Sequence, residues 1–491
     1  MQRLVTLTQN MFVGAVLSGV LIGCAAAFAP LWWCVIPGVA LLYTGIWRTS
    51  SYTTATVYSL IVGFLKAGVA VSWLLAAYPA DWLGGASRFE QLVVIVGCWL
   101  GTLLSVGVGY AFVGISVRAM KTHSTVVRGI CFAAALLISE LIGSLGFSIY
   151  TYGNGGVLNV NFANSYVGFA LAYHSLLKHV AVVWGVYGLT VLVALISYGL
   201  ALLTLRAKTA SRRVCIAAVF LVCIYLTGIL PDSSTPAQGT AVAAVGTAFD
   251  SFVSFTDSEL AHEQRVLGSG IEEALQAGAA TVVLPEDARF GNIQDETKLY
   301  QHLTQMSHAP GAIIVDSSRT DVSQTSAVTR AYIYDIDAHH TYQVDKQFIV
   351  PMGEYLPYLH TEAIRALGGE EFFANMTHIP GTASLDANTP QRIPNVLFCF
   401  EGGATGLVQS KVAAHQSTLM AHPVSHGWFH HPYILWNEER QMLIVQALYA
   451  HTAILQAGNN APTELYRADG STSLGSIIAT HKDSVVVLFS I

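Results

Sequence analysis

The chain has 491 residues, of which 53% are hydrophobic and only 11% are charged, and its formal net charge is −6. Soluble globular domains carry roughly 25% charged residues, which argues against a chain that is soluble throughout. The negative charge argues against nucleic acid as a partner, and we find neither a basic patch nor a phosphate-binding glycine loop in the sequence.

The apolar residues are concentrated in the first half of the chain. Residues 232–491 have the composition of an ordinary soluble domain, and the polar segment 231–240, PDSSTPAQGT, separates the two parts. The sequence therefore predicts a membrane domain, 1–231, of about seven transmembrane helices and an extramembrane domain, 232–491. A helix needs about 17–25 apolar residues to cross a bilayer, and the runs of this length lie near 11–29, 31–47, 54–78, 92–117, 127–147, 179–205 and 213–230.

Lysine and arginine in the short loops indicate how the helices are oriented. Basic residues are retained in the cytoplasm. The loops around 79–91 and 148–177 contain only Arg88, so these loops should lie outside. We therefore expect a multi-pass protein of the bacterial inner (cytoplasmic) membrane, with residues 232–491 in the periplasm. The basic residues that should lie inside are Arg3, Arg48, Arg118, Lys121, Arg128, Arg206, Lys208, Arg212 and Arg213.

Cysteine usage distinguishes one thiol from the others. Cys399 is the only cysteine of the extramembrane half. Although we expect this half to lie in an oxidising compartment, it contains no second cysteine with which Cys399 could form a disulfide. LIGC at 21–24 matches a lipoprotein signal pattern, but further spans follow directly, so we interpret Cys24 as part of the first membrane helix. The predicted membrane helices contain the other cysteines, Cys24, Cys34, Cys98, Cys131, Cys215 and Cys223.

Strand and helix patterns alternate in the extramembrane half, which predicts a mixed α/β sandwich. Residues 257–278 have apolar side chains at helical spacing. The segments that predict strands are 241–250, 280–287, 311–318 and 330–337, the last leading through AHHTYQVDK to 347–355.

Three apolar runs of this half carry a reactive side chain at one end. TVVLPE ends on Glu286, Lys346 precedes the run in VDKQFIVP, and NVLFCFE contains Cys399. A thiolate can attack a carbonyl, a carboxylate can take the thiol proton, and an ammonium can stabilise the oxyanion that forms. Taken singly, the same residues could be a core thiol, a solvated glutamate and a surface lysine. Together they indicate an acyl-transfer site.

The segments around these residues resemble the three catalytic motifs of the nitrilase superfamily. The motifs are LPEDARFG (284–291), KQFIVPMGEYLP (346–357) and LFCFEGG (397–403), in the family's order. The lysine shortly before VPMGEYLP is similar to that of bacterial apolipoprotein N-acyltransferases. The resemblance implies a multi-span α-helical membrane domain joined to an α/β nitrilase-like four-layer (αββα) sandwich.

The resemblance also implies a role for each of five residues. Glu286 would be the general base, Lys346 the oxyanion-stabilising lysine and Cys399 the acylated nucleophile. Glu354 would match the second essential carboxylate, which orients the lysine or the thiol. Glu401 would match the acidic residue after the nucleophile. A turn at Gly353–Glu354 and a flanking salt bridge at Glu401 are the purely structural alternatives.

Aromatic residues near these motifs are the candidates for substrate binding. Phe400 stands in place of the family's usual tyrosine, and Trp428 and Phe429 match its downstream Trp-Phe pair. Tyr355 and Tyr358 open the aromatic segment 355–373, which we expect either to contact lipid headgroups or to form a buried helix.

Three positions depart from the family pattern. His426 replaces an aspartate, and the loop EGGATG (401–406) lacks the expected bulky residues. The last residues, 475–491, predict a strand where the family has a further membrane helix.

The function implied is that of a membrane-bound N-acyltransferase. It would move an acyl chain from phospholipid, through a cysteine thioester, to the N-terminal amine of a lipoprotein. No cofactor is implied, and no metal is expected because His426, His430 and His431 lack the paired spacing of a zinc centre.

Two alternatives to this function stay open. One is a membrane-tethered amidase or an acyltransferase with another acceptor, as in nitrilase-like proteins encoded with conjugal-transfer genes. The other is an inactive nitrilase-like scaffold.

Overall fold

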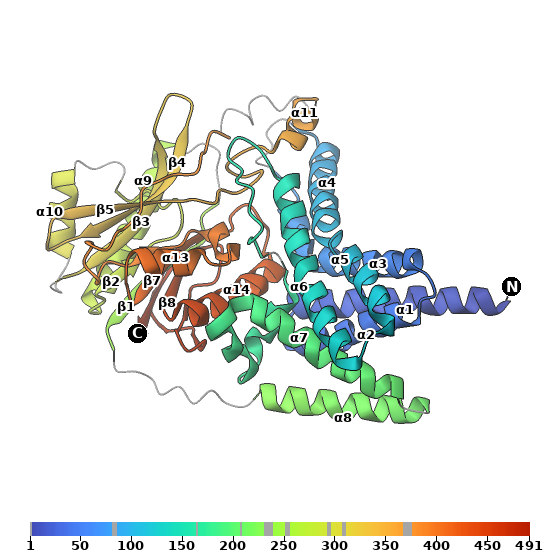
Figure 1. Cartoon of the computed structure of the whole chain (residues 1–491). Coiled ribbons are helices and arrows are strands. Elements are labelled where there is room, and N and C mark those ends of the chain that lie inside the picture. Colours follow the sequence, from blue (N-terminus) through green and yellow to red (C-terminus); the bar gives the residue numbers. More distant parts are fainter. Residues whose placement is uncertain are drawn as a thin grey trace.

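The computed structural model describes residues 2–80, 86–163, 165–206, 209–229, 239–250, 256–291, 296–306, 311–366 and 376–491. Helices form the first half of the chain, and an α/β half packs against one end of them (Figure 1). Most of the predicted linker, 231–240, lies outside the described residues, so the boundary at 231 stays a prediction.

The helical half follows the predicted apolar runs. Six helical segments of the described chain are long and apolar enough to cross a membrane. The first predicted run lies in α1, whose apolar part Met11–Ala27 is shorter than these six. The α-helices are α1 (Gln2–Ala27), α2 (Val35–Arg48), α3 (Tyr52–Ala70), α4 (Arg88–Gly107), α5 (Tyr110–Ala119), α6 (Thr125–Tyr150), α7 (Ala181–Arg206) and α8 (Ala210–Gly228). The short 3-10 helices are η1 (Ala29–Cys34), η2 (Val71–Ala77), η3 (Met120–Thr122), η4 (Val167–Tyr173) and η5 (Leu177–Val180).

Basic side chains of residues 118–128 contact α2 and the loop between α2 and α3, at the end of the helices that lies away from the α/β half. Arg118 donates to the Ser50 carbonyl and Lys121 to the Thr49 carbonyl, each at 2.7 Å. Arg128 lies 4.6 Å from the centre of the Trp47 ring. The loops that the positive-inside rule assigned to one side are therefore neighbours in space.

The α/β half contains two sheets that one bridge, Thr247 to Asn459, joins into a twelve-stranded whole. The first sheet has the order β11-β12-β1-β2-β3-β4-β5 and the second β6-β7-β8-β9-β10. In the first sheet, the strands are β1 (Ala241–Thr247), β2 (Thr281–Val283), β3 (Ile313–Asp321), β4 (Ala327–Asp335), β5 (His340–Asp345), β11 (Ser476–Thr480) and β12 (Ser484–Ser490). In the second, they are β6 (Asn395–Val396), β7 (Leu419–Ser425), β8 (Ala453–Asn459), β9 (Glu464–Tyr466) and β10 (Thr472–Ser473).

Helices cover the outer face of each sheet. One apolar core lies between the sheets, where Val283 of β2 packs in the same cluster as Leu455 of β8. A second core lies between the first sheet and helices α9 (Asp257–Gln276) and α10 (Glu296–Met306). Helices α13 (Leu407–Ala414) and α14 (Tyr433–Ala450) cover the second sheet and share a core with the helical half. The predicted fold, a helical membrane domain plus a four-layer α/β sandwich, is confirmed.

Helix α14 forms much of the contact between the halves (Figure 1). Asn437 and Gln441 donate to the Ala26 carbonyl at the end of α1, at 2.7 and 3.2 Å. Trp73 of η2 donates to the Glu438 carboxylate at 3.2 Å. The second sheet is therefore held against the helical half through its own covering helix.

Candidate active site

Three strands of the two sheets deliver the three predicted reactive groups. Glu286 follows β2, Lys346 follows β5 directly, and Cys399 follows β6 and begins the short helix η6 (Cys399–Gly403). The prediction of a strand over 347–355 is wrong. Gln347 and Phe348 donate their backbone N–H groups to the Glu401 carboxylate, at 2.6 and 3.2 Å, and not to a neighbouring strand. The chain therefore leaves the sheet just after Lys346.

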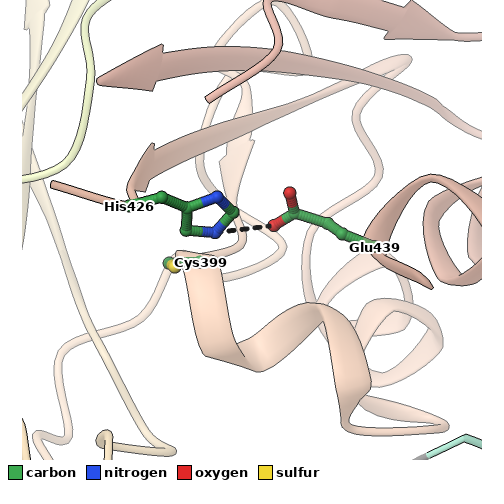
Figure 2. A group of neighbouring side chains, drawn as sticks. All are labelled: Cys399, His426 and Glu439. Atoms are coloured by element: carbon green, nitrogen blue, oxygen red, sulfur yellow. Dashed lines mark ion pairs between the residues drawn. The ribbon is translucent and has the colours of Figure 1, made fainter. Parts of the chain in front are cut away.

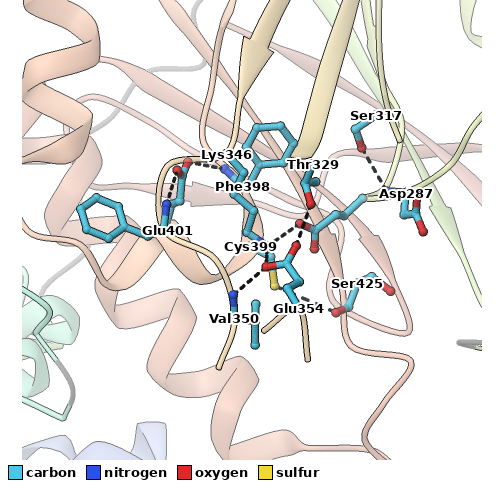
Figure 3. Close-up of polar contacts among 12 residues, drawn as sticks. Asp287, Ser317, Thr329, Lys346, Val350, Glu354, Phe398, Cys399, Glu401 and Ser425 are labelled. Carbon is cyan, nitrogen blue, oxygen red and sulfur yellow. Dashed lines mark hydrogen bonds and ion pairs between the residues drawn. The ribbon is translucent and has the colours of Figure 1, made fainter. Parts of the chain in front are cut away.

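The ammonium of Lys346 lies between two carboxylates. Its Nζ is 2.9 Å from Oε1 of Glu286 and 2.9 Å from Oε2 of Glu354. Glu354 is fixed in turn by the backbone N–H of Val350, at 2.6 Å, and by the hydroxyl of Thr329, at 2.7 Å (Figure 3). The structure thus brings Glu286, Lys346 and Glu354 into one hydrogen-bonded group, with the lysine side chain only 1% exposed.

Electrostatics gives the two carboxylates different character. Burial raises the pKa of Glu286 to about 7, although Lys346 opposes the shift. Burial acts on Glu354 in the same direction, but the Lys346 charge and hydrogen bonds from Val350 and Thr329 outweigh it and lower its pKa. Lys346 keeps a raised pKa because the two carboxylates outweigh the effect of burial. Glu286 is therefore the group that can exchange a proton near neutral pH.

Cys399 is half-buried, and its sulfur lies near these charges (Figure 3). Its Sγ is 4.0 Å from the Ser425 carbonyl oxygen. Burial, and after it the charges of Glu286 and Glu439, raise the thiol pKa well above its ordinary value, whereas Lys346 opposes the shift. The resting group is therefore a thiol, which needs a base before it can act as a nucleophile.

Glu401 holds the nucleophile turn against the lysine segment. Its carboxylate is fully buried and accepts from the backbone N–H of Gln347, Phe348 and Phe398. Nζ of Lys411, in α13, lies 3.6 Å from Oε2, the oxygen that also accepts from Phe398. A carboxylate with these contacts positions the residues on both sides of the site and is not available as a proton carrier. Glu401 is a positioning residue in this geometry.

Phe400 faces the helical half. Its ring stacks on Phe162, with 4.4 Å between the ring centres. A cavity of about 30 Å³ lies beside this pair. It is lined from the helical half by Phe147, Ser148 and Phe162, and from the α/β half by Phe348, Tyr355 and Phe400, among others.

The other residues predicted to contact substrate are Tyr355, Tyr358, Trp428 and Phe429. Of the two expectations for this segment, a headgroup contact and a buried position, Tyr355 follows the second: it is buried, and its hydroxyl donates to the Thr151 carbonyl at 2.8 Å. Tyr358 is exposed at the start of α11 (Tyr358–Ala366), as expected. Phe429 packs edge-on against Trp73 of η2, and Trp428 is half-buried beside it. The apolar residues Leu367, Phe372 and Phe373 of the same predicted segment lie outside the described residues.

The tertiary structure places beside the nucleophile polar residues that the sequence did not connect with it. His426 and Glu439 approach Cys399 (Figure 2). His422 lies next to Glu439. Thr329 on β4 fixes Glu354 from a neighbouring strand. The one signal in the sequence is the run Glu438–Glu439–Arg440, which stands between the apolar residues at the two ends of α14. A buried charge of this kind needs a partner.

Comparison with known proteins finds similarity only among solved structures. No family model and no curated protein matches the chain. An amidase variant from Nesterenkonia sp. AN1, with the acetamide moiety of fluoroacetamide bound covalently to its active-site cysteine, is 12% identical with a TM-score of 0.38, covering 53% of this chain and 93% of that one. A cysteine-to-alanine variant of the same nitrilase-superfamily amidase is 12% identical with a TM-score of 0.37, covering 52% and 93%. A further structure of an amidase from Nesterenkonia sp. is 13% identical with a TM-score of 0.35, covering 52% and 94%.

Proposed function

We propose that the chain is a membrane-bound acyltransferase of the bacterial inner membrane, with residues 232–491 as a catalytic domain on the periplasmic side. Its acyl donor is a phospholipid, and its acceptor is the N-terminal amine of a lipoprotein. The observation that carries the proposal is the position of the nucleophile turn. Ala163 donates to the Gly403 carbonyl at 2.8 Å and Thr405 to the Asn161 carbonyl at 2.9 Å, so the turn after Cys399 rests on a loop of the helical half.

The residues of the site can carry out both halves of such a transfer. Glu286 takes the proton of the Cys399 thiol, and the sulfur attacks the ester carbonyl of the donor. Lys346 stabilises the oxyanion, the C–O bond breaks, and the leaving alcohol receives the proton from Glu286. In the second half the acceptor amine attacks the thioester, Glu286 takes the amine proton, and the thiolate leaves and is reprotonated.

A second candidate is hydrolysis of a small amide, in which water replaces the acceptor amine. The cavity next to Phe400 favours it, because its volume of about 30 Å³ is far below that of a fatty acyl chain. This cavity lies beside the nucleophile turn, and Cys399, Glu286 and Lys346 do not line it. Both reactions use Cys399, Lys346 and Glu286. An experiment can therefore distinguish them by the acyl donor, phospholipid or small amide, that forms the thioester.

Mass spectrometry of the purified protein tests the proposal. After incubation with labelled phospholipid, we expect an acyl thioester on Cys399 that disappears when a diacylglyceryl peptide with a free N-terminal cysteine is added. Cys399→Ala should form no adduct, and Cys131→Ala in α6 should behave like the parent. An adduct from short amides but not from phospholipid would favour the amidase, and the absence of any adduct would exclude covalent catalysis.

A further inference from the structure

A second polar group lies beside the nucleophile, distinct from the one that contains Lys346. One ligand atom each of Cys399, His426 and Glu439 lies within 4.8 Å of the other two (Figure 2). His426 follows β7 directly, and Glu439 lies in the second turn of α14. Both side chains are buried, at 2% and 6% exposure. The acyl-transfer mechanism above uses neither of them.

Buried neighbours hold Glu439 in this position. Its Oε2 accepts from the Gln456 amide at 3.1 Å, and its Oε1 lies 3.9 Å from Nε2 of His426. The same oxygen lies 3.4 Å from Nε2 of His422, a histidine that is fully buried. Two imidazole rings near one oxygen and an amide on the other therefore hold the Glu439 carboxylate in place beside Cys399.

The position of His422 adds a further nitrogen to this group. Its Nδ1 is 2.6 Å from the Leu397 carbonyl oxygen, and this contact turns its Nε2 toward Oε1 of Glu439 at 3.4 Å. A second imidazole therefore lies beside the three groups, on the side of Glu439.

We propose that Cys399, His426 and Glu439 form a binding site for Zn²⁺ that holds the enzyme inactive. Thiolate, imidazole and carboxylate are the ligand types of zinc, and three protein ligands leave a fourth position for water. In tetrahedral zinc sites, bond lengths of about 2.0–2.3 Å place the donor atoms about 3.3–3.8 Å apart. The donor atoms, which now lie within 4.8 Å of one another, therefore need to come closer by up to about 1–1.5 Å on binding.

Charge balance also favours a divalent ion. Binding displaces the thiol proton to solvent, and the thiolate and the Glu439 carboxylate together neutralise the two charges of Zn²⁺. The sulfur lone pair is then committed to the metal and cannot attack a carbonyl. Only this inhibitory consequence rests on the proposed function, because the metal site itself needs no acyl transfer.

Alkylation of Cys399 tests the site without reference to activity. In a full-length protein whose six other cysteines are replaced by alanine, Cys399 is the single thiol, and its rate of reaction with iodoacetamide can be followed against buffered free Zn²⁺. We expect Zn²⁺ to slow the reaction at least about tenfold and Mg²⁺ to leave it unchanged, because Mg²⁺ prefers oxygen ligands. His426→Asn and Glu439→Gln should each shift the Zn²⁺ midpoint upward by about tenfold or more.

His430→Asn is the matched control, since His430 lies in the same loop but is exposed and contacts the Pro79 carbonyl. It should keep the parental midpoint, and thermal unfolding should show that all variants are folded. Metal content of the Cys399→Ala protein after dialysis supplies a second readout, with loss of bound zinc expected. Equal zinc protection in His426→Asn, Glu439→Gln and the parent would overturn the proposal, because the thiol alone would then bind the metal. Absence of protection in the parent would overturn it too, whether or not thioester forms.

Discussion

At the scale of single residues, the site is defined by one ammonium shared between two carboxylates. Lys346 is 1% exposed and pairs with Glu286 and Glu354 at equal distances of 2.9 Å. A buried lysine and a single carboxylate would form a pair with no net charge. With two carboxylates around Lys346, the group has one negative charge in excess when all three are ionised, and this charge lies next to the thiol. The pKa of Glu286 accordingly rises and that of Glu354 falls. The division of roles, with one base and one fixed partner, follows from this geometry.

Replacing Lys346 by methionine should reduce thioester formation by on the order of 10²–10³, because the oxyanion of the tetrahedral intermediate loses its charged donor. Arginine should not restore the rate, because its planar guanidinium does not fit a compact buried point-charge site. Lys298→Met, on α10, removes a lysine elsewhere and serves as the control. The initial rate with labelled donor is the measurement, and a wild-type rate in Lys346→Met would exclude the assigned role.

The rate of thioester formation should increase as pH rises through about 7, the raised pKa of the buried Glu286. Below this pH the carboxyl group is protonated and cannot accept the thiol proton, so the rate should fall about tenfold for each further unit. Glu286→Gln should give a slow rate without this rise. Stopped reactions at pH values from about 5 to 9 measure the profile. A flat profile for the wild type would mean that another group takes the proton.

At the scale of elements, one carboxylate links the turn after β6 to the segment after β5. Glu401 accepts N–H groups from Gln347 and Phe348 of one segment and from Phe398 of the other. Because the segment after β5 bonds to a side chain instead of a strand, it can turn and carry Glu354 back toward Lys346. The short helix η6 then directs Phe400 to the helical half while Cys399 faces the charges.

Glu401→Gln should destabilise the α/β half by about 3–5 kcal/mol, the usual cost of leaving one member of a buried ion pair unpaired, here Lys411. The glutamine side chain would also place an N–H group opposite backbone N–H groups that now donate to the Glu401 carboxylate. Adding Lys411→Met to Glu401→Gln should recover part of the loss, since the unpaired charge is removed. Denaturant unfolding of the two variants and the parent measures both effects. Equal stability of Glu401→Gln and the parent would contradict the positioning role.

At the scale of the whole molecule, the helices alternate in direction between two chemically different ends. The α1 helix ends at Ala27, beside α14, and η2 at the end of α3 also contacts α14. The α2 and α5 helices end instead at the basic residues Arg48 and Arg118, away from the α/β half. If α1 crosses the membrane like the longer helices, seven crossings place the N-terminus and the α/β half on opposite sides.

A reporter enzyme that is active only outside the cytoplasm should be active when fused after Asp232 and inactive when fused after Arg48. The physical reason is the retention of basic loops on the cytoplasmic side. A reporter of the opposite type provides the reciprocal control at both positions. Activity on the cytoplasmic side after Asp232 would mean that α1 does not cross, and it would remove the periplasmic location from the proposed function.

The sequence by itself determined the elements that depend on local pattern. Apolar runs of membrane-spanning length predicted the helices of the first half, and alternating strands and helices predicted the α/β half, because periodicity reports burial residue by residue. Motif resemblance also indicated Glu286, Lys346 and Glu354, which the structure brings together, and Cys399 beside them. The strand expected over 347–355 failed because the Glu401 carboxylate, more than fifty residues away in sequence, captures its N–H groups.

Only the tertiary structure decided what surrounds the nucleophile. His422, His426 and Glu439 come from β7, the loop after it and α14, and no spacing in the sequence relates them to Cys399. For Tyr355 the sequence left a headgroup contact and a buried position open, and the tertiary structure buries it, with its hydroxyl donating to the Thr151 carbonyl at the end of α6. Phe400 of the α/β half likewise stacks on Phe162 of the helical half, a contact that only the packing of the two halves creates. Contacts of this kind depend on how sheets, covering helices and membrane helices pack against one another, and local pattern carries no information about that packing.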